Sequence, residues 1–306
     1  MCFSEEIKAY ALSLGFDACG ICPAGDSGEE EHYMQWLSEK CHAGMDYLER
    51  HIEKRLNPVL LVEGARSIIS VALNYYPHQK LPPHVPQFAY YAYGKDYHKV
   101  MKDKLEALFR FIRLHFPEVR GRCFVDSAPV LERFWAVKAG LGFIGKNTLL
   151  IIPQKGSYFF LGELIIDKEL DYDEPLKLSC GNCRKCLDAC PTGAIEKPYW
   201  LNANKCVSYQ TIENKGEIEP AVIPCLQNNV YGCDICQQVC PWNRFAVPHC
   251  TPEFFPSDDF LSLDFEKLEK MNKETFRRVF RDSAVKRAKF QGLKRNIEAL
   301  RKSAQK

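Results

Sequence analysis

The spacing of apolar residues over the first 170 positions predicts a series of helices and strands. Apolar side chains that recur every three to four residues are typical of helices, which we expect at 4–14, 29–40, 96–116 and 129–139. Short runs rich in β-branched and aromatic residues are typical of strands, which we expect at 16–22, 66–76, 122–126, 148–153 and 158–166. The last two strands are predicted to form a hairpin around Lys155 and Gly156. This pattern indicates an α/β or α+β domain.

The pattern changes beyond residue 170, and the change predicts three parts. Nine cysteines lie between Cys180 and Cys240, whereas the residues after 250 are again helical and mostly basic. We therefore expect an α+β protein with three consecutive parts. These are an N-terminal α/β domain over residues 1–170, a cysteine-rich module over 171–250 and a basic helical segment over 251–306.

Composition indicates a reducing compartment. No apolar stretch approaches the ~20 residues of a membrane-spanning helix, and the N-terminus has acidic residues where a signal peptide would be apolar. We therefore expect a cytoplasmic protein that does not bind membranes. Because disulfides are rare in the cytoplasm, fifteen cysteines among 306 residues favour metal binding.

The net charge of +2 conceals a basic C-terminal segment. Residues 271–306 contain twelve Lys and Arg against three Asp and Glu, a local charge of +9, so the rest of the chain carries −7. Basic helices are usually solvated surfaces, but this one is also suited to follow a phosphate backbone. It is therefore our candidate for an RNA-binding surface.

Two cysteine runs carry the strongest chemical signal. The run at 180–191 follows the C-x2-C-x2-C-x3-C-P spacing of bacterial two-cluster ferredoxins, in which the fourth cysteine ligates the other cluster. The run at 233–241 has the same spacing but carries Val230 in place of its first cysteine. Cys206 is the favoured replacement, and Cys225 is the alternative. The spacing predicts two [4Fe–4S] clusters, one held by Cys180, Cys183, Cys186 and Cys240, the other by Cys190, Cys206, Cys233 and Cys236.

Two zinc sites are the alternative interpretation, because C-x2-C pairs also build zinc ribbons. A zinc ribbon needs neither a third cysteine at the same spacing nor a proline after the fourth, so the sequence favours iron–sulfur clusters. The remaining seven cysteines are expected to be ordinary thiols, with Cys19 and Cys22 buried in a strand.

A glycine-rich stretch imitates two nucleotide-binding motifs. Gly140, Gly142 and Gly145 fit G-x-G-x-x-G, and Lys146 with Asn147 nearly completes a phosphate-binding loop. Both motifs need a strand before the glycines and a helix after them, but the order here is reversed. We expect a turn that ends a helix, from which Lys146 and Asn147 can still contact another polar ligand.

Four stretches together resemble epoxyqueuosine reductase, a cobalamin-dependent enzyme of queuosine synthesis in tRNA. They are FVDSAPVLERFWAVKAGLGFIGKNTLLI (Phe124–Ile151), CGNCRKCLDACPTGAI (Cys180–Ile195), CVSYQTIENKGEI (Cys206–Ile218) and YGCDICQQVCPWNRF (Tyr231–Phe245). The resemblance extends over about residues 1–300 and implies a cobalamin-binding catalytic domain beside a ferredoxin-like module. The implied reaction, that of an oxidoreductase, removes the epoxide oxygen from epoxyqueuosine at the tRNA wobble position.

The same resemblance implies that Asp126 is the proton donor, because the departing oxygen needs a proton. We expect burial beside the cofactor to raise the pKa of this carboxyl group. The sequence alone also allows Asp126 to cap the helix expected at 129–139. His98 lies in a D-x-H sequence that lacks the glycine of D-x-H-x-x-G cobalt-ligand motifs. We therefore expect cob(II)alamin without a protein axial ligand, and His98 at the start of a helix.

Further cofactor or substrate contacts are implied by the resemblance, with a purely structural role as the alternative for each. They are Arg55, Lys146, Asn147, Ser157, Ser208, Tyr209, Cys233 and Asp234. Recognition of a single-stranded anticodon base would also need an aromatic side chain for stacking. The candidates, with core packing favoured for each, are Trp200, Tyr209, Tyr231 and Trp242.

The resemblance implies a monomer that binds epoxyqueuosine-containing tRNA and receives electrons from a low-potential donor of unknown identity. Longer members of the family continue into a C-terminal helical-repeat domain that helps to hold tRNA, so a chain that ends at Lys306 predicts a short form without it. Two other functions stay open at this point. One is a cobalamin and iron–sulfur reductase of the reductive dehalogenase type, in which we would expect an export signal. The other is a ferredoxin-like electron carrier without catalysis of its own.

Overall fold

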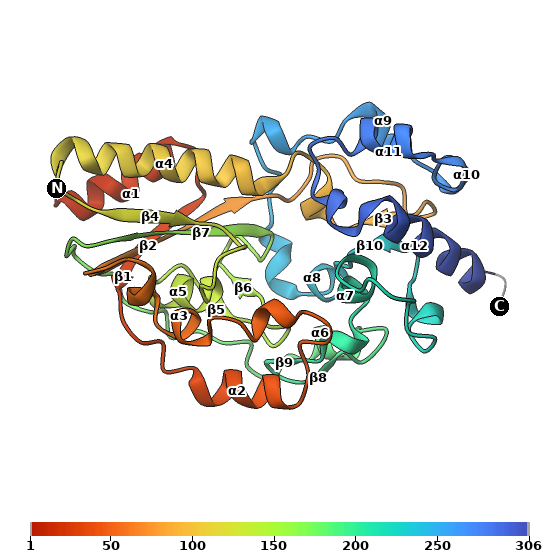
Figure 1. Ribbon diagram of the computed structural model, residues 1–306, viewed down its shortest axis with the longest axis horizontal. Coiled ribbons are helices and arrows are strands. Elements are labelled where there is room, and N and C mark those ends of the chain that lie inside the picture. The colour runs from red at the N-terminus through yellow and green to blue at the C-terminus, as the bar shows by residue number, and fades with distance from the viewer. Residues whose placement is uncertain (1, 305–306) are drawn as a thin grey trace.

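The computed structural model describes residues 2–304 and shows an elongated molecule whose N-terminus and C-terminal helix lie at opposite ends (Figure 1). The N-terminal part is built on a four-stranded sheet in the order β1-β2-β7-β4, in which every neighbouring pair is antiparallel. All eight residues of β2 are buried, as expected for a central strand that is covered on both faces. The strands are β1 (Ala18–Pro23), β2 (Ser67–Asn74), β7 (Phe159–Ile166) and β4 (Gly121–Phe124).

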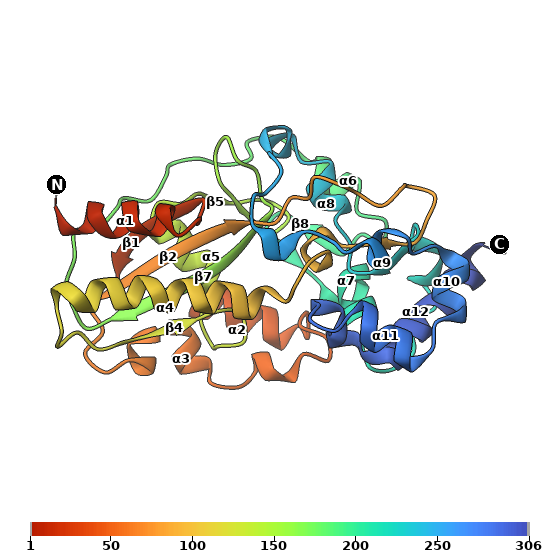
Figure 2. The ribbon, with the colours of Figure 1, turned by 90° about the horizontal axis from the view of Figure 1, so that it is seen from above.

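Helices cover both faces of this sheet. α1 (Phe3–Ser13) and α4 (Tyr97–His115) lie side by side over one face (Figure 2). α5 (Glu132–Lys138) packs against the other face. Successive side chains of β7 point to opposite faces, so Phe160 joins the core under α1 and α4 while Ile165 joins the core under α5.

Most of the elements predicted for the N-terminal part are confirmed. A single antiparallel bridge, between Ile152 and Gly156, forms at the predicted turn, but the predicted pairing of the two strands is wrong. β6 (Leu150–Ile151) pairs with β5 (Phe143–Ile144), whereas β7 pairs with β2 and β4. Gly142 gives the physical reason, because a Cβ atom there would lie 2.1 Å from the backbone oxygen of Ile151. Glycine thus lets the segment after α5 approach β6 and take the place of the expected partner.

The cysteine-rich module consists of short elements. Its helices are α6 (Lys185–Asp188), α7 (Val207–Ile212) and α8 (Ile235–Gln238), and its strands are β8 (Ile195–Lys197), β9 (Trp200–Leu201) and β10 (Asn229–Tyr231). β10 pairs in parallel with β3 (Gln87–Phe88), which comes from the N-terminal part of the chain. Two further helices of the N-terminal part are α2 (Glu30–Ser38) and α3 (Ile52–Leu56).

The C-terminal segment packs on the cysteine-rich module. Its last helix lies against β10 and α7 (Figure 1), and Asn296, which is fully buried, donates hydrogen bonds to the backbone oxygens of Thr211 (2.7 Å) and Val230 (2.8 Å). One hydrophobic core therefore combines side chains from 81–93, 207–231 and 260–300. The helices of this segment are α9 (Asp258–Leu261), α10 (Phe265–Lys270), α11 (Lys273–Val279) and α12 (Lys289–Ala304).

The division of the chain at residues 170 and 250 stays a prediction. The shared core shows that the segment after 250 is a packed part of the molecule and that the basic helix is one side of this core. Within residues 2–304, no helix is both long and apolar enough to cross a membrane.

Candidate active site

Asp126 lies at the centre of a strained three-residue turn, Val125–Ser127, here called the Asp126 turn. The backbone φ of Asp126 is +52°, and the N–H of Ser127 donates a hydrogen bond to the backbone oxygen of Val125 at 2.6 Å. A γ-turn with positive φ is rare and strained for a residue other than glycine. Helix α5 begins six positions later at Glu132, with Leu131 at its N-cap. The alternative interpretation of Asp126 as a helix cap is therefore wrong.

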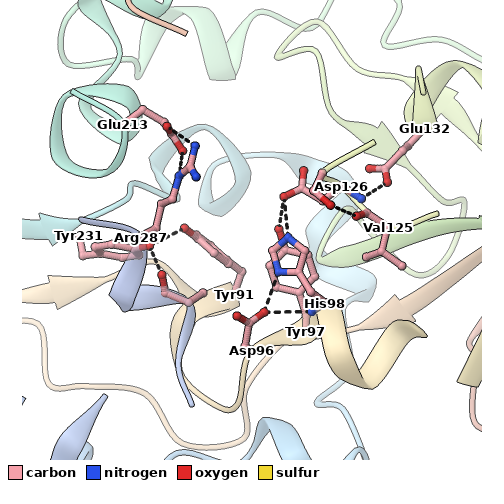
Figure 3. Close-up of polar contacts among 12 residues, drawn as sticks. Tyr91, Asp96, Tyr97, His98, Val125, Asp126, Glu132, Glu213, Tyr231 and Arg287 are labelled. Atoms are coloured by element: carbon pink, nitrogen blue, oxygen red, sulfur yellow. Dashed lines mark hydrogen bonds and ion pairs between the residues drawn. The ribbon is translucent and has the colours of Figure 1, made fainter. Parts of the chain in front are cut away.

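The Asp126 carboxylate contacts the first two residues of α4 (Figure 3). The hydroxyl group of Tyr97 donates a hydrogen bond to Oδ2 of Asp126 at 2.6 Å, and Nε2 of His98 lies 3.1 Å from the same oxygen. Nδ1 of His98 lies 2.7 Å from Oδ1 of Asp96, which also accepts the backbone N–H of His98 and caps the helix. His98 thus lies at a helix start, as predicted, and also faces Asp126. Sequence reasoning missed Tyr97, although it is the middle residue of the D-x-H motif.

Opposing effects of the surroundings set the pKa values of Asp126 and His98. Desolvation raises the pKa of Asp126, but hydrogen bonds from His98 and Tyr97 outweigh it and bring the pKa below its usual value. The side chain is also 55% exposed. With the protein groups alone, the pKa of Asp126 is thus lowered, and the raised pKa expected for burial beside the cofactor stays a prediction. Hydrogen bonds to Asp126 and Asp96 raise the pKa of His98 to about 9, so at neutral pH the ring is an imidazolium beside a carboxylate.

An ion pair from the C-terminal part of the chain faces this group (Figure 3). Nε and Nη2 of Arg287 donate hydrogen bonds to the two carboxylate oxygens of Glu213 at 2.7 and 2.8 Å. The charge of Arg287 helps to lower the pKa of Asp126, which places the two side chains in one neighbourhood. Beside them, the hydroxyl group of Tyr231 lies 3.2 Å from that of Tyr91. No local sequence pattern predicts this pairing, because the partners are far apart along the chain.

The four cysteines assigned to the first cluster surround one cavity. Its volume is about 120 Å³, and its other lining residues include Lys146, Asn147 and Trp242. Lys146 donates hydrogen bonds to the backbone oxygens of Gly181 (2.6 Å) and Cys183 (2.9 Å), so this lysine fastens the cysteine loop to the N-terminal part. Four thiols around one space fit a [4Fe–4S] cluster. The thiols that line the cavity are Cys180, Cys183, Cys186 and Cys240.

The four cysteines assigned to the second cluster lie close enough to affect one another's ionisation. Burial, together with the nearby thiols of Cys206 and Cys190, raises the pKa of Cys233 to about 12. Cys236 responds to the same thiols. Four thiolates that repel one another suit a cationic iron centre, which would hold them deprotonated. Cys225, the alternative ligand, has its Sγ 3.8 Å from the backbone oxygen of Ala221.

The described residues contain no group of three His, Cys, Asp or Glu side chains gathered closely enough to hold a single metal ion. Among the other thiols, burial raises the pKa of both Cys19 and Cys22 to about 12. Both lie on β1 as predicted, but only Cys22 is fully buried and Cys19 is half-buried.

The glycine-rich stretch forms the predicted helix-ending turn. Gly140 has φ +75°, and its N–H and that of Leu141 donate hydrogen bonds to backbone oxygens in the last turn of α5. This geometry is a helix C-cap and not a phosphate-binding loop. Asn147 is buried, and its Nδ2 lies 3.5 Å from the backbone oxygen of Cys236.

The other candidate contacts are distributed around the junction of the two parts. Ser157 is buried and bonded to Asn243, and the hydroxyl group of Tyr209 accepts the N–H of Gly44 at 2.9 Å. Ser208 is half-buried on α7. Asp234 is buried and accepts the N–H of Tyr90 at 2.7 Å. Arg55 is buried, and its Nη2 lies 3.4 Å from the backbone oxygen of Tyr47.

Two of the four aromatic candidates for stacking belong to the core. Trp200 and Tyr231 are buried, which confirms core packing for both. Trp242 and Tyr209 are half-buried; Trp242 lines the cavity of the first cluster.

Comparison with known proteins identifies the family. The family model described as "Epoxyqueuosine reductase QueG, DUF1730" matches residues 55–127, and that described as "4Fe-4S double cluster binding domain" matches residues 179–243. The chain is 49% identical to the epoxyqueuosine reductase of Leadbetterella byssophila over 96% of its own length and 97% of that protein. The chain belongs to the epoxyqueuosine reductase family. Its cysteine-rich module is accordingly a double [4Fe–4S] cluster domain, not a pair of zinc sites.

Solved epoxyqueuosine reductases share the whole fold. A crystal structure of an epoxyqueuosine reductase with an epoxyqueuosine-modified tRNA-Tyr stem loop has a TM-score of 0.91 at 32% identity, covering 98% of this chain and 81% of that one. The Bacillus subtilis epoxyqueuosine reductase, crystallised with its catalytic aspartate loop swung out of the active site, has a TM-score of 0.89 at 31% identity with the same coverage. Membership of the epoxyqueuosine reductase family favours a reductase over an electron carrier or a dehalogenase.

Proposed function

We propose that this protein reduces epoxyqueuosine to queuosine at the wobble position of tRNA. The observation that carries the proposal is the Asp126 turn, whose carboxylate is hydrogen-bonded to Tyr97 and His98. The chain that contains this turn belongs to the epoxyqueuosine reductase family. Removal of the epoxide oxygen breaks two C–O bonds, forms a C=C bond and releases water. The step therefore consumes two electrons and two protons, and the site must supply both.

Asp126 and its neighbours supply the protons in this proposal. Because the pKa of Asp126 is lowered while that of His98 is raised to about 9, the resting proton is held on His98 and is shared with Asp126 across their 3.1 Å contact. Asp126 is 55% exposed and is therefore open to a bound substrate. His98 transfers its proton to Asp126, which passes it to the departing oxygen, and a second proton that His98 takes up from solvent follows the same route and completes the water molecule.

The residues around the site fit cobalamin, which we propose as the cofactor. Within residues 2–304, the buried Nε of Arg55 has no hydrogen-bond partner, and a buried cationic donor of this kind calls for an acceptor from a bound group. Arg55 lies beside Tyr47, whose ionisation also responds to Arg287 and Asp126, so the unpaired donor adjoins the proposed proton donor. When bound, cobalamin supplies the electrons that break the C–O bonds.

The candidates proposed to hold the cofactor contribute unequally. Arg55 is buried with an unpartnered Nε, whereas the side chains of Asn147, Lys146 and Tyr209 already make the hydrogen bonds described above. Ser157 is similarly committed to Asn243. Ser208, Cys233 and Asp234 are proposed to line the cofactor site, and none of them is proposed to ligate cobalt.

The two clusters are proposed to deliver electrons to the site one at a time. Helix α6 carries Cys186, a ligand of the first cluster, and is followed by Cys190 of the second; α8 carries Cys236 of the second and is followed by Cys240 of the first. This crossed arrangement keeps the clusters within a short electron-transfer distance. We infer an external low-potential, one-electron donor and a monomeric protein.

The tRNA is proposed to dock on the basic C-terminal surface. A cavity of about 340 Å³ there has four basic side chains and two phenylalanines in its wall. Lys286 also helps to lower the pKa of Asp96, the partner of His98, so this surface adjoins the catalytic group. Cations for phosphates next to aromatic rings for bases suit an RNA loop. The lining residues are Lys273, Phe276, Arg277, Lys286, Lys289, Phe290 and Gln291.

Anaerobic turnover tests the proposal. The protein is reconstituted with iron, sulfide and cobalamin, reduced chemically, and incubated with an epoxyqueuosine-containing tRNA-Tyr stem loop. We expect nucleoside analysis to show queuosine, and omission of either cobalamin or the reductant to abolish it. Intact cluster absorbance without cobalamin uptake and without queuosine would contradict the proposal and favour an electron carrier.

A further inference from the structure

We propose that Glu132 is the positioning residue of this site, whose carboxyl group accepts the backbone N–H of Asp126 and holds the Asp126 turn in its strained, inward conformation. The inference deepens the proposed function and rests on the role of Asp126 as proton donor. Glu132 itself contacts no reacting atom in this proposal. It acts through the backbone of Asp126.

The strained backbone of the Asp126 turn has to be stabilised by a contact from outside the turn. Asp126 has φ +52°, and the turn is closed only by the contacts between Ser127 and Val125. A residue other than glycine stays in this strained backbone conformation only where contacts with neighbouring groups stabilise it. Without an external contact, the turn would relax and carry the carboxylate away from Tyr97 and His98.

The contacts that fix the turn come from two directions (Figure 3). Tyr97 and His98 bind the Asp126 side chain from α4, and Glu132 binds its backbone N–H from the opposite side. Among the described residues, Glu132 is the one hydrogen-bond partner of this N–H. It is the first residue of α5, a helix anchored in the core by Trp135, so the acceptor is carried by a rigid element.

The protonation state of Glu132 makes this contact compatible with a carboxylate next to it. Desolvation, followed by the charge of Asp126, raises the pKa of Glu132 to about 8, while the hydrogen bond from the Asp126 N–H and the charges of Arg133 and His98 act in the opposite direction. On β7 behind it, the fully buried Glu163 also has its pKa raised well above the usual value. At neutral pH Glu132 is therefore mostly a neutral acid, whose carbonyl oxygen can accept the N–H without two adjacent negative charges. Glutamine preserves that oxygen, and alanine removes it.

Amide hydrogen exchange of the Asp126 turn measures the hold directly and needs no cofactor or substrate. We expect exchange at Asp126 in Glu132→Ala to be about tenfold or more faster than in the wild type, because a hydrogen bond of this kind is lost. Glu132→Gln should exchange at the wild-type rate. Lys138→Ala, an exposed change in the last turn of the same helix, is the matched control and should also leave exchange unchanged.

Kinetics and stability complete the test. In the reconstituted enzyme, Glu132→Ala should lower kcat by about tenfold with KM little changed, and Glu132→Gln should restore it. The thermal midpoints of both variants should stay close to that of the wild type. Unchanged exchange in Glu132→Ala, or an equal defect in Glu132→Gln, would overturn the proposal.

Failure of the two proposals can be told apart. If the wild-type protein forms no queuosine but Glu132→Ala still exchanges faster at Asp126, then the proposed function fails while the hold on the turn stands. If the wild type is active but the exchange rates are equal, then Glu132 does not position Asp126.

Discussion

Asp126 is held in an unfavourable backbone conformation by favourable contacts of its own groups. A residue in a strained φ region costs on the order of 1–3 kcal/mol, and a typical hydrogen bond returns about 0.5–1.5 kcal/mol. Asp126 makes three such contacts, to Tyr97, His98 and Glu132, which together can offset the strain. The same contacts set its charge, so geometry and proton supply are fixed by one small group.

Replacement of Asp126 by Asn tests its role as the proton donor. Asp126→Asn keeps an oxygen for the Tyr97 hydroxyl group but cannot carry an acidic proton, so we expect kcat to fall by about 10²- to 10⁴-fold. Cobalamin uptake and both cluster absorbances should be unchanged. Asp103→Asn, on an exposed turn of α4 where Asp103 pairs with Lys99, is the matched control. Wild-type turnover by Asp126→Asn would contradict the assignment.

The titration of His98 tests the proton-sharing pair. Its pKa of about 9 comes first from the hydrogen bond with Asp126, then from that with Asp96. We expect Asp126→Asn to lower the pKa of His98 toward its ordinary value of ~6.5, as followed by imidazole NMR signals. Because the folded-state pKa lies above the unfolded one, the protonated ring stabilises the fold fully below pH ~6.5. This contribution is lost as the pH rises through about 9. An unchanged pKa of His98 in Asp126→Asn would contradict the proposed proton sharing between the two side chains.

Only some of the individual residues of the site can be predicted from the sequence. Resemblance to the family singled out Asp126, and the capping pattern placed His98 at a helix start. The lowered pKa of Asp126 was missed because it depends on Tyr97 and His98 meeting the turn across 28–29 positions. Arg287 and Glu213 are 74 positions apart, and no local periodicity reports such a contact.

At the scale of elements, α6 and α8 decide how the cysteines are shared. Each is a short helix with one ligand inside it and the next ligand just after its end. Spacing alone predicts the crossed ligation, because the ferredoxin run is a local signal, whereas the two helices are not predicted. The incorrect hairpin at 148–166 is the opposite case, because its pairing depends on the close approach that Gly142 permits.

Iron content tests the choice between Cys206 and Cys225. The sequence leaves both open, whereas Cys206 lies at the N-cap of α7 beside Cys190, and helix N–H groups there favour its thiolate. We therefore expect Cys206→Ser to lower the iron content from about eight to about four per chain, and Cys225→Ser to retain about eight. The measurements are iron analysis and electron paramagnetic resonance after reduction. The reverse pattern would assign the ligand to Cys225.

At the scale of the whole molecule, the three predicted parts meet at one site. The N-terminal sheet and α4 supply Asp126 and His98, the cluster module supplies Glu213, and the C-terminal segment supplies Arg287. The basic cavity lies on this last segment. Substrate, protons and electrons can thus approach from three directions, one from each part of the chain.

The salt dependence of RNA binding tests the basic cavity. Each phosphate contact contributes about 0.7–0.9 to the slope of log K against log salt. We expect Lys286→Ala with Lys289→Ala to weaken binding of the stem loop at all salt concentrations and to reduce the slope by roughly 1–2. Lys99→Ala with Lys102→Ala, a pair of exposed lysines on α4, is the charge-matched control and should leave the slope unchanged. Equal slopes in both double variants would place the RNA elsewhere.

The core that joins 81–93 to 207–300 has a consequence for biosynthesis. Its first strand, β3, cannot pair until β10 is made, because the partner residues are about 140 positions later, and the core is closed by α12. The N-terminal sheet can be completed while the ribosome is still translating, but this second core cannot. Apolar side chains such as Phe88 therefore stay exposed on the nascent chain until α12 has been synthesised. Metallation of the thiols on α6 and α8 and closure of the active site are thus expected to be coupled steps that follow the synthesis of α12.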